Sequence, residues 1–390
     1  MPTRTATTRI GAGVSTAESA AAAAVEAAQE AAAGLGGVEP DLAFLFLSPP
    51  HVEGAKAAAL ALREELQPGA LVGCVAEGVL ARSREVEEGP AVAIWAASLP
   101  GAEVELFRAE AIPAEGGLAI AGFPEPADPS LVALLVDPFT FPAGPLLEEL
   151  NESRPGLPLV GGIASGAGRP GTQALIVDDE VYERGAVGAV VRGARVCTVV
   201  SQGCSPFGRE AVITRAEENV VYELAGERPL DRLRHEVAGL DPEGRELVAR
   251  GILAGLVIDE NKAEYGRGDY LMRGLLGIDE ESGAIAIGER VRVGQTLRFH
   301  VRDAETADED LRETLGGELR GERAAGALLF TCNGRGTNMF AEPDHDARAV
   351  GQVLGCDAVA GFFCGGEIGP VGGRAFLHGF TATLAVFLEP

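Results

Sequence analysis

Two glycine-rich segments near the end of the chain combine polar side chains with flexible backbone. The segment CNGRG (332–336) follows an apolar run and supplies an amide, a guanidinium and backbone N–H groups. The segment CGGEIG (364–369) follows another apolar run and places Glu367 directly after two glycines. Because glycine lets backbone approach a small molecule closely, both segments are typical of a pocket wall. Arg335 could pair bidentately with a ligand carboxylate, and Glu367 could receive an ammonium group.

Arg335 and Glu367 also admit a purely structural interpretation. The two charges could pair with each other across the two turns and bind nothing. With a ligand between them, the same guanidinium and carboxylate would suit a zwitterion such as an amino acid. In both alternatives the CNGRG and CGGEIG turns face each other.

Cys332 is the candidate for covalent chemistry. It ends an apolar run beside Arg335, with His345 and His378 further along the chain. A thiolate near a cation or an imidazole has a lowered pKa and can attack a carbonyl carbon. The alternative is a packed thiol at a strand end, with His378 hydrogen-bonded locally. An enzyme that uses Cys332 or Glu367 on a small-molecule substrate therefore stays open beside a binding protein.

The segment EPDHD (342–346) contains side chains that coordinate divalent ions. It also begins an expected helix, where acidic side chains cap N–H groups and stabilise the positive end of the dipole. Consecutive residues there point to different sides, so we favour the cap and predict no metal site. The side chains concerned are Glu342, Asp344, His345 and Asp346.

No nucleotide-binding loop is expected. The segment GAGRPG (166–171) matches the GxGxxG pattern, but a dinucleotide site needs a helix to begin there. Pro170 and the following TQALIVDD (172–179) instead indicate a turn into another strand. The chain also lacks a GxxxxGK[ST] phosphate loop and a GxSxG nucleophile turn. We therefore expect no cofactor.

The composition restricts the partners. The 390 residues include 32 Lys and Arg against 58 Asp and Glu, a net charge of −26. This acidity disfavours nucleic acid and anionic membrane faces, which are bound by basic patches. We expect no membrane span and no secretory signal, since the necessary apolar runs are missing. A cytoplasmic protein is predicted, whose six cysteines are free and mostly buried because they form no CxxC or zinc pattern.

A strand–helix–strand unit occurs three times and positions these segments. The first strands end at equivalent polar or thiol positions, and the second strands each contain an equivalent glycine. A short turn then leads to a third strand. The first strands lie within 41–50, 130–139 and 326–335, and the second within 71–80, 159–166 and 359–369. The equivalent residues are Ser48, Asp137 and Cys332, then Gly73, Gly161 and Gly361, and the third strands are placed at 91–99, 172–179 and 378–387.

These units predict an α/β fold of mixed type, with two domains built from repeated strand–helix–strand–strand units and mixed sheets layered with helices. Between the second and third copies, 227–237 is helical and charged. The segment 283–303 alternates apolar and charged residues, which predicts an antiparallel strand pair joined at Gly294. We place the domain boundary near 215–225, giving modules 1–220 and 221–390.

The chain resembles the FIST family (F-box and intracellular signal transduction). ALLFTCNGRGTNMFAEPDHDARAV, VAGFFCGGEIGPVGG, FLHGFTATLAVF and GDYLMRGLLGIDEESGAIAIG are similar to the family's C-terminal module. The strand–helix units that end in LVGC and LVGG are similar to its N-terminal module. The likeness covers about 30–385. With no length left for a kinase, a cyclase or an F-box, the chain resembles the stand-alone bacterial form.

The resemblance implies a sensory module for small ligands, with amino acids proposed, that informs a separate signalling protein. By motif match it carries Glu342, Asp344 and Gly361 over together with the turn residues. It more strongly implies a binder than an enzyme. The ligand-binding positions predicted from the two turns and the resemblance are Asn333, Gly334, Arg335, Gly336, Gly366, Glu367 and His378.

Overall fold

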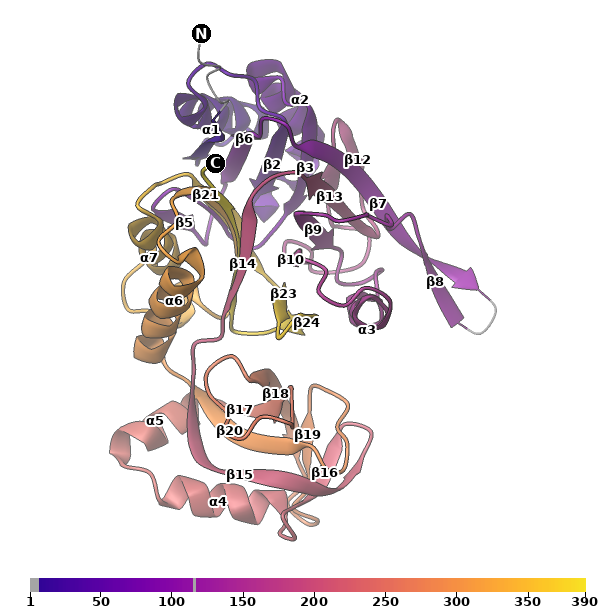
Figure 1. Cartoon of the computed structure of the whole chain (residues 1–390), viewed down its shortest axis with the longest axis vertical. Coiled ribbons are helices and arrows are strands. Elements are labelled where there is room, and N and C mark those ends of the chain that lie inside the picture. Colours follow the sequence, from indigo (N-terminus) through magenta and orange to yellow (C-terminus); the bar gives the residue numbers. More distant parts are fainter. Residues whose placement is uncertain (1–6, 115–116) are drawn as a thin grey trace. The chain divides into compact units, whose positions relative to one another are not determined.

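The computed structural model describes residues 7–114 and 117–390, and it has the mixed α/β fold that the sequence predicts (Figure 1). The chain divides into two compact units. The first comprises residues up to Val200, Arg312–Leu377 and Thr381–Pro390, and the second comprises Ser201–Leu311 and His378–Phe380. The boundary predicted near 220 refers to sequence modules and stays a prediction.

The first unit contains the three predicted copies. In each copy two parallel strands flank a helix, and a third strand pairs antiparallel with the first. The first copy is β2(Leu42–Leu47), α2(Ala55–Leu66), β3(Ala70–Val75) and β6(Val92–Ser98). The second is β9(Leu131–Val136), α3(Ala143–Ser153), β10(Leu159–Ile163) and β13(Ala186–Arg192). The third is β21(Ala324–Cys332), α7(His345–Leu354), β22(Val359–Cys364) and β25(Ala382–Leu388).

The third strand of the second copy was predicted at 172–179, and this is wrong. Residues in that segment form β11(Leu175–Val177), which pairs with β3 of the first copy. The position equivalent to β6 and β25 belongs to β13. The apolar run of β11 is short and lies directly after the glycine turn, so it mimics a third strand in the sequence.

Each copy gives a hairpin to a different copy. The hairpin β4(Val79–Ala81)–β5(Arg84–Val86) of the first copy pairs with β22 of the third. The hairpin β23(Glu367–Val371)–β24(Arg374–His378) of the third copy pairs with β10 of the second. The hairpin β11–β12(Glu180–Tyr182) of the second copy pairs with β3 of the first. The exchange therefore closes a cycle.

The predicted glycines mark the same place in each copy. Gly73, Gly161 and Gly361 lie opposite Leu45, Leu134 and Leu329 of the parallel neighbour. A Cβ atom at these glycines would lie 2.0, 1.9 and 1.6 Å from the carbonyl oxygen of that leucine. A side chain there cannot coexist with this backbone, so the close strand approach requires glycine.

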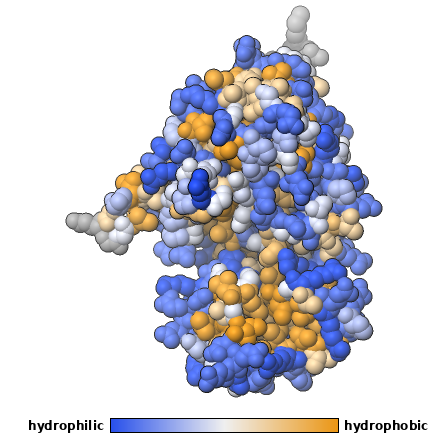
Figure 2. Space-filling model, turned by 180° about the vertical axis from the view of Figure 1, so that it is seen from behind, coloured by the Kyte–Doolittle hydropathy of each residue, from blue (hydrophilic) through white to orange (hydrophobic). Residues whose placement is uncertain are grey.

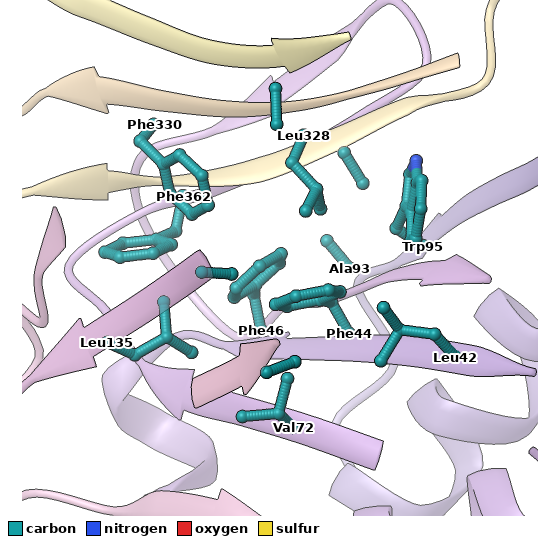
Figure 3. Close-up of a cluster of buried hydrophobic side chains, with 14 of the residues drawn as sticks. Leu42, Phe44, Phe46, Val72, Ala93, Trp95, Leu135, Leu328, Phe330 and Phe362 are labelled. Atoms are coloured by element: carbon teal, nitrogen blue, oxygen red, sulfur yellow. The ribbon is translucent and has the colours of Figure 1, made fainter. Parts of the chain in front are cut away.

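The three sheets surround a common apolar core (Figure 3). Phe46 of the first copy lies 5.2 Å from Phe362 of the third, between ring centroids, and Leu135 of the second copy joins the same cluster. The other face of β2 packs against helices. Strands buried on both faces explain the continuous apolar runs that made them predictable.

The remaining elements of the first unit extend the sheets. β1(Arg9–Ser15) pairs with β6 and packs on α1(Ala20–Leu35), while the long β7(Glu103–Ala114) pairs with β13 and with β8(Gly117–Ala121). β14(Val196–Ser201) lies beside β25. Two short 3₁₀ segments follow first strands, η1(Pro49–Gly54) and η2(Gly336–Asn338).

The second unit is a closed barrel. Its strands follow the order β15(Cys204–Glu217), β16(Val220–Leu224), β19(Ile285–Ile287), β18(Tyr270–Ile278), β17(Ile252–Val257) and β20(Thr296–Arg302). Two helices accompany it, α4(Pro229–Ala238) and α5(Pro242–Arg250), and α6(Ala304–Leu319) leads the chain out. The predicted strand pair at 283–303 is wrong in its pairing, because β19 pairs with β16 and β18 while β20 pairs with β15 and β17.

The surface seen in Figure 2 is largely hydrophilic, but on this side the second unit gathers apolar side chains. The large apolar side chains that the second unit exposes are Val212, Leu276, Ile278 and Val293. None of the helices in the described part of the chain has the length and apolar character needed to cross a membrane.

We expect Gly361→Ala to lower the free energy of unfolding by about 3 kcal/mol or more, because the new Cβ would force β21 and β22 apart. Gly316→Ala is the matched control: it lies in α6 with open space around its Cβ position. There the same substitution should stabilise by about 0.5–1 kcal/mol. Urea unfolding of both variants measures the difference, and equal effects would contradict the strand-approach argument.

Candidate functional site

The ends of the three first strands are equivalent in detail. The N–H groups of Ser48, Asp137 and Cys332 donate to the carbonyl oxygens of Ala91, Gly185 and Thr381, at 2.9, 2.9 and 3.0 Å. This equivalence confirms the alignment of the copies that the sequence predicts. It also allows the side chains at each position to be compared within one protein, which shows where the third copy differs.

The third copy carries a buried ion pair. Arg335 is fully buried and donates from Nε to Oδ2 of Asp346 at 2.7 Å and from Nη2 to Oδ1 at 2.8 Å. The Thr331 hydroxyl donates to the same carboxylate at 2.6 Å. Burial acts to raise the pKa of Asp346, but the Arg335 charge and these hydrogen bonds hold it well below its ordinary value. Bidentate geometry makes this a strong, oriented contact.

The structural alternative, in which Arg335 pairs with Glu367, is not formed, because the partner of Arg335 is Asp346. The sequence placed Asp346 at a helix start as a dipole-stabilising residue. It lies in the first turn of α7, where its carboxylate is turned to the guanidinium instead of to solvent. A helix-start acid and an arginine 11 residues earlier are separated by a loop, so no periodicity links them.

Glu367 is the first residue of β23 and is fully buried. Its Oε2 accepts hydrogen bonds from the Thr381 N–H at 3.1 Å and from the Thr381 hydroxyl at 2.8 Å. Its buried Oε1 has no hydrogen-bond partner among the described residues. Burial raises the pKa of Glu367 to about 8, although the Thr381 hydrogen bonds act to lower it. The carboxyl group is thus held largely as a neutral acid at neutral pH.

The other two copies show that this position does not need a carboxylate. Glu367 lies opposite Gly162, and the equivalent hairpin residues are Val79 opposite Phe362 and Leu175 opposite Cys74. Both are fully buried apolar side chains. A buried acid with an unsatisfied oxygen costs stability where valine or leucine would not.

Thiols surround this carboxyl group. A hydrogen bond from the Cys332 side chain acts on the Glu367 carboxyl, and Cys332 is paired in register with Cys364 across β21 and β22. Burial raises the pKa of Cys364 well above its ordinary value, with further contributions from Glu367 and from the neighbouring thiols Cys74 and Cys332. All six cysteines are free, as predicted, and four of them are buried.

The CNGRG turn lies beside the CGGEIG turn. The N–H of Asn333 donates to the carbonyl of Cys364 at 3.0 Å, and the N–H of Gly334 to the Cys332 sulfur at 3.4 Å. Gly336 is buried with a φ of 53°. Gly366 accepts from the N–H of Ile163 at 2.8 Å.

The predicted residues that come together are therefore Asn333, Gly334, Arg335, Gly336, Gly366 and Glu367. His378 is buried at the end of β24 and belongs to the second unit.

Three glutamates of the first copy's hairpin region complete the site, and the sequence analysis missed them. Glu77 accepts from the Asn333 amide at 2.9 Å, and Glu87 from the Thr337 N–H at 2.9 Å. Glu85 accepts from the N–H of Ala347 at 2.8 Å. Burial, followed by the charge of Asp346, raises the pKa of Glu85 to about 8. Glu77 and the three glutamates of REVEE (84–88) look like ordinary surface acids in the sequence. Nothing local predicts that they contact residues some 250 positions away.

Side chains of the EPDHD segment form contacts with other residues of the chain. Asp344 stands at the N-cap of α7, but its carboxylate makes no cap; it accepts from the N–H of Glu85 at 2.7 Å and from Arg348 at 2.9 Å. His345 stacks on Phe340 and contacts Asp346 at 3.0 Å, while Glu342 is exposed. Among the residues that the structure describes, no cluster of acids, histidines or cysteines has the arrangement of a metal site.

Open depressions of about 870 and 410 Å³ are formed by described residues of the first unit. The larger is lined in part by Arg154, Arg195 and Arg320, the smaller by Arg82 and Arg348. Neither is lined by Asn333, Arg335 or Glu367. Arg335, Gly366 and Glu367 are buried, whereas Asn333 and Gly334 are half-buried and Gly365 is exposed.

Comparison with known proteins defines the class. The FIST N domain matches residues 41–227 and the FIST C domain matches residues 229–370, so the chain belongs to the FIST family. FIST domains are recognised as sensory domains of signal transduction. The uncharacterized protein Rv0628c of Mycobacterium tuberculosis H37Rv is 47% identical over 385 residues, covering 98% of this chain and 100% of the relative. The uncharacterized protein Mb0898c of Mycobacterium bovis is 46% identical, covering 98% and 99%.

The raised pKa values predict a pH dependence. Glu367 and Glu85 hold their protons more tightly in the folded than in the unfolded chain, whose ordinary pKa is 4.5. Their contribution to stability is therefore complete below about 4.5 and is lost as the pH rises through about 8. We expect the free energy of unfolding to fall over this window.

Glu367→Gln should remove about 2–4 kcal/mol of this fall, since a tenfold change in proton affinity corresponds to about 1.4 kcal/mol. Urea unfolding at several pH values from 5 to 8 measures it. Exposed Glu39→Gln is the control and should leave the profile unchanged. A Glu367→Gln profile parallel to that of the parent protein would refute the assignment.

Proposed function

We propose that this protein is a small-ligand sensor whose ligand is recognised in the third copy, at the CNGRG and CGGEIG turns. The carrying observation is Glu367: a fully buried carboxyl group with one unsatisfied oxygen, where the other copies have valine and leucine. Buried polar groups that lack a partner in a stable fold are uncommon and call for a functional reason.

The ligand class follows from what is left unsatisfied. Glu367 Oε1 calls for a donor, and an ammonium group would both donate and favour the ionised carboxylate. Arg335 is committed to Asp346, so we assign it the role of holding the turn rather than of binding a ligand carboxylate. Opening of the turns would free backbone N–H groups as donors for that end, since the N–H of Gly334 now donates to the Cys332 sulfur and that of Gly365 to the carbonyl oxygen of Ile163. An amino acid or a similar zwitterion fits this pattern.

Because Glu367 is fully buried, a ligand that reaches its Oε1 must open the turns, and the opening is the signal that a separate signalling protein would read. The turn at Gly365 and Gly366 leads directly into β23, which pairs with β10 of the second copy. Movement at the turn would therefore displace β23 against β10, which belongs to a different sheet from β22. This makes the exchanged hairpin the element that both ligand and partner would bias.

A thiol enzyme is the second candidate, favoured by the contact between Cys332 and the Glu367 carboxyl group. An ionised Glu367 could take the thiol proton as a general base. Cys332→Ala separates the two functions, because it would abolish turnover in an enzyme and leave ligand binding in a sensor largely intact.

Converting the third copy to the chemistry of the first tests the site. Glu367→Val alone should destabilise by about 1–3 kcal/mol, since the buried Thr381 N–H loses its acceptor. The double variant Cys332→Ser/Glu367→Val should recover within about 1 kcal/mol of the parent. In the first copy, the Ser48 hydroxyl accepts from the N–H of Ala91 at 2.7 Å, and a serine at position 332 would do the same for Thr381.

That double variant is the folded control for a ligand screen. Thermal unfolding of the full chain against the twenty amino acids should show a selective stabilisation, about 2.7 kcal/mol at 100 times the dissociation constant. The N-acetylated form of the same amino acid, which lacks the ammonium group, should have no effect. A response that persists in the double variant, or one that the N-acetylated form reproduces, would remove Glu367 from the binding site.

A further inference from the structure

The barrel of the second unit contains a cavity of about 90 Å³, separate from the turns discussed above. Its wall combines apolar and sulfur-containing side chains with polar ones. Tyr270, Met272 and Cys204 supply much of the apolar surface, and His300, Gln202 and Asp310 the polar surface. Ligand sites are common at the mouths of barrels, and the lining here is that of a binding site: mostly apolar with a few polar groups.

His300 is the buried imidazole of this lining. The residue is 2% exposed, and its ring stands against Tyr270 with centroids 4.9 Å apart. Its Nδ1 lies 3.1 Å from the carbonyl oxygen of Arg298, so the proton is on Nδ1 and Nε2 carries the lone pair. Nε2 has no hydrogen-bond partner among the residues described. Burial lowers the pKa of His300 to about 4, which keeps the ring neutral.

The backbone makes room for this imidazole. A Cβ atom on Gly255 would lie 2.5 Å from Cε1 of His300 and 2.6 Å from Nδ1. The ring therefore rests on a glycine of the neighbouring strand β17, which pairs with β20.

The other polar groups of the wall are engaged. The Gln202 amide donates to the carbonyl of Tyr270 at 2.6 Å, and the Tyr270 hydroxyl to Glu210 at 3.0 Å. Asp310 accepts from the Ser201 hydroxyl at 2.7 Å and from the N–H of Gln202 at 2.8 Å. The lone pair of His300 Nε2 is thus an acceptor that the wall offers, on a ring that the Nδ1 hydrogen bond holds in place.

We propose that this cavity is a second binding site, which takes a compact neutral molecule through one N–H or O–H donor to Nε2 of His300. A volume of about 90 Å³ suits about three to five non-hydrogen atoms, since a cavity of roughly 150 Å³ holds benzene. Arg267 and Arg298 also line the cavity and disfavour a cation, while the carboxylate of Asp310 disfavours an anion. Water alone is a poorer occupant, because it needs two to four polar partners.

Two five-membered rings of equal size test the proposal on the full chain. Pyrazole has an N–H donor, and isoxazole has none. The ¹⁵N resonances of the imidazoles report the hydrogen bond directly, and with five histidines in the chain they can be assigned by substitution. Pyrazole should shift the Nε2 resonance of His300 saturably, and isoxazole should bind at least about tenfold more weakly, the loss of about one hydrogen bond.

His300→Phe should weaken pyrazole binding by a similar factor or more. The matched control is His51→Phe, another imidazole buried to 3% exposure but placed in the first unit, away from this cavity. It should leave pyrazole binding unchanged. The comparison of the two azoles on the parent protein needs no variant, so a variant that fails to fold does not remove the test.

Three results would overturn the proposal. The His300 resonance could ignore both azoles, which would leave the cavity to water. Isoxazole could bind as tightly as pyrazole, which would exclude the imidazole as the acceptor. Pyrazole affinity could also fall equally in His300→Phe and His51→Phe, which would make the effect one of stability.

Discussion

A parallel strand pair leaves the outer edge of its second strand without hydrogen-bond partners, and the first unit is built around that constraint. Each copy leaves such an edge, at β3, β10 and β22, and each edge is covered by a hairpin from another copy. An unpaired apolar edge is a site of aggregation. The copies therefore complete one another and no copy is complete alone. As a result, residues that are far apart in the sequence become neighbours in a sheet: residues near 80 pair with a strand near 360.

The exchange also assembles the candidate site. The hairpin β4–β5 brings the first copy's acidic residues onto the turn after β21, where Glu77 holds Asn333 and Glu87 holds Thr337. The hairpin β23–β24 begins at Glu367 and carries this carboxyl group to the edge of β10. The polar side chains of the candidate site thus lie where all three copies meet. The common apolar core also draws on all three, through Phe46 of β2, Leu135 of β9 and Phe362 of β22.

The sequence predicted strands correctly where both faces of the strand are buried. The runs LAFLFL, LVALLV and ALLFTC are continuous because neither face meets water, and their glycines are fixed by strand approach. The hairpins were not predictable in this way. β4 and β5 have three residues each, and β23 reads EIGPV, which resembles a turn. Their pairing spans hundreds of residues, and nothing local records it. Glu367 was accordingly expected on the turn itself, whereas it begins the strand.

The same reasoning separates the predictable from the unpredictable part of the site. Glycines and polar residues after a strand indicated where chemistry would lie, and Asn333, Arg335 and Glu367 do lie together there. The partner of Arg335 was missed because a buried ion pair depends on three-dimensional closure. The barrel cavity was missed as well, since His300 lies in RFHV, an alternating strand in which it reads as one more half-exposed polar residue.

Three copies of one structural unit make the energetic comparison internal to the protein. The first two copies show what the fold requires at each position: a small acceptor or acid at the strand end, and an apolar side chain where the hairpin begins. The third copy keeps the backbone and replaces these with a thiol, a buried carboxyl group and an ion pair. A buried ion pair is weak support for stability, because desolvation offsets much of the attraction. Both the second and the third copy hold a fully buried carboxyl group with one unpartnered oxygen, at Asp137 and at Glu367, but only the third adds a buried ion pair among the described residues of these turns. The asymmetry between the copies is therefore confined to the side chains at the strand end and at the hairpin start, while the backbone pairing is the same in all three.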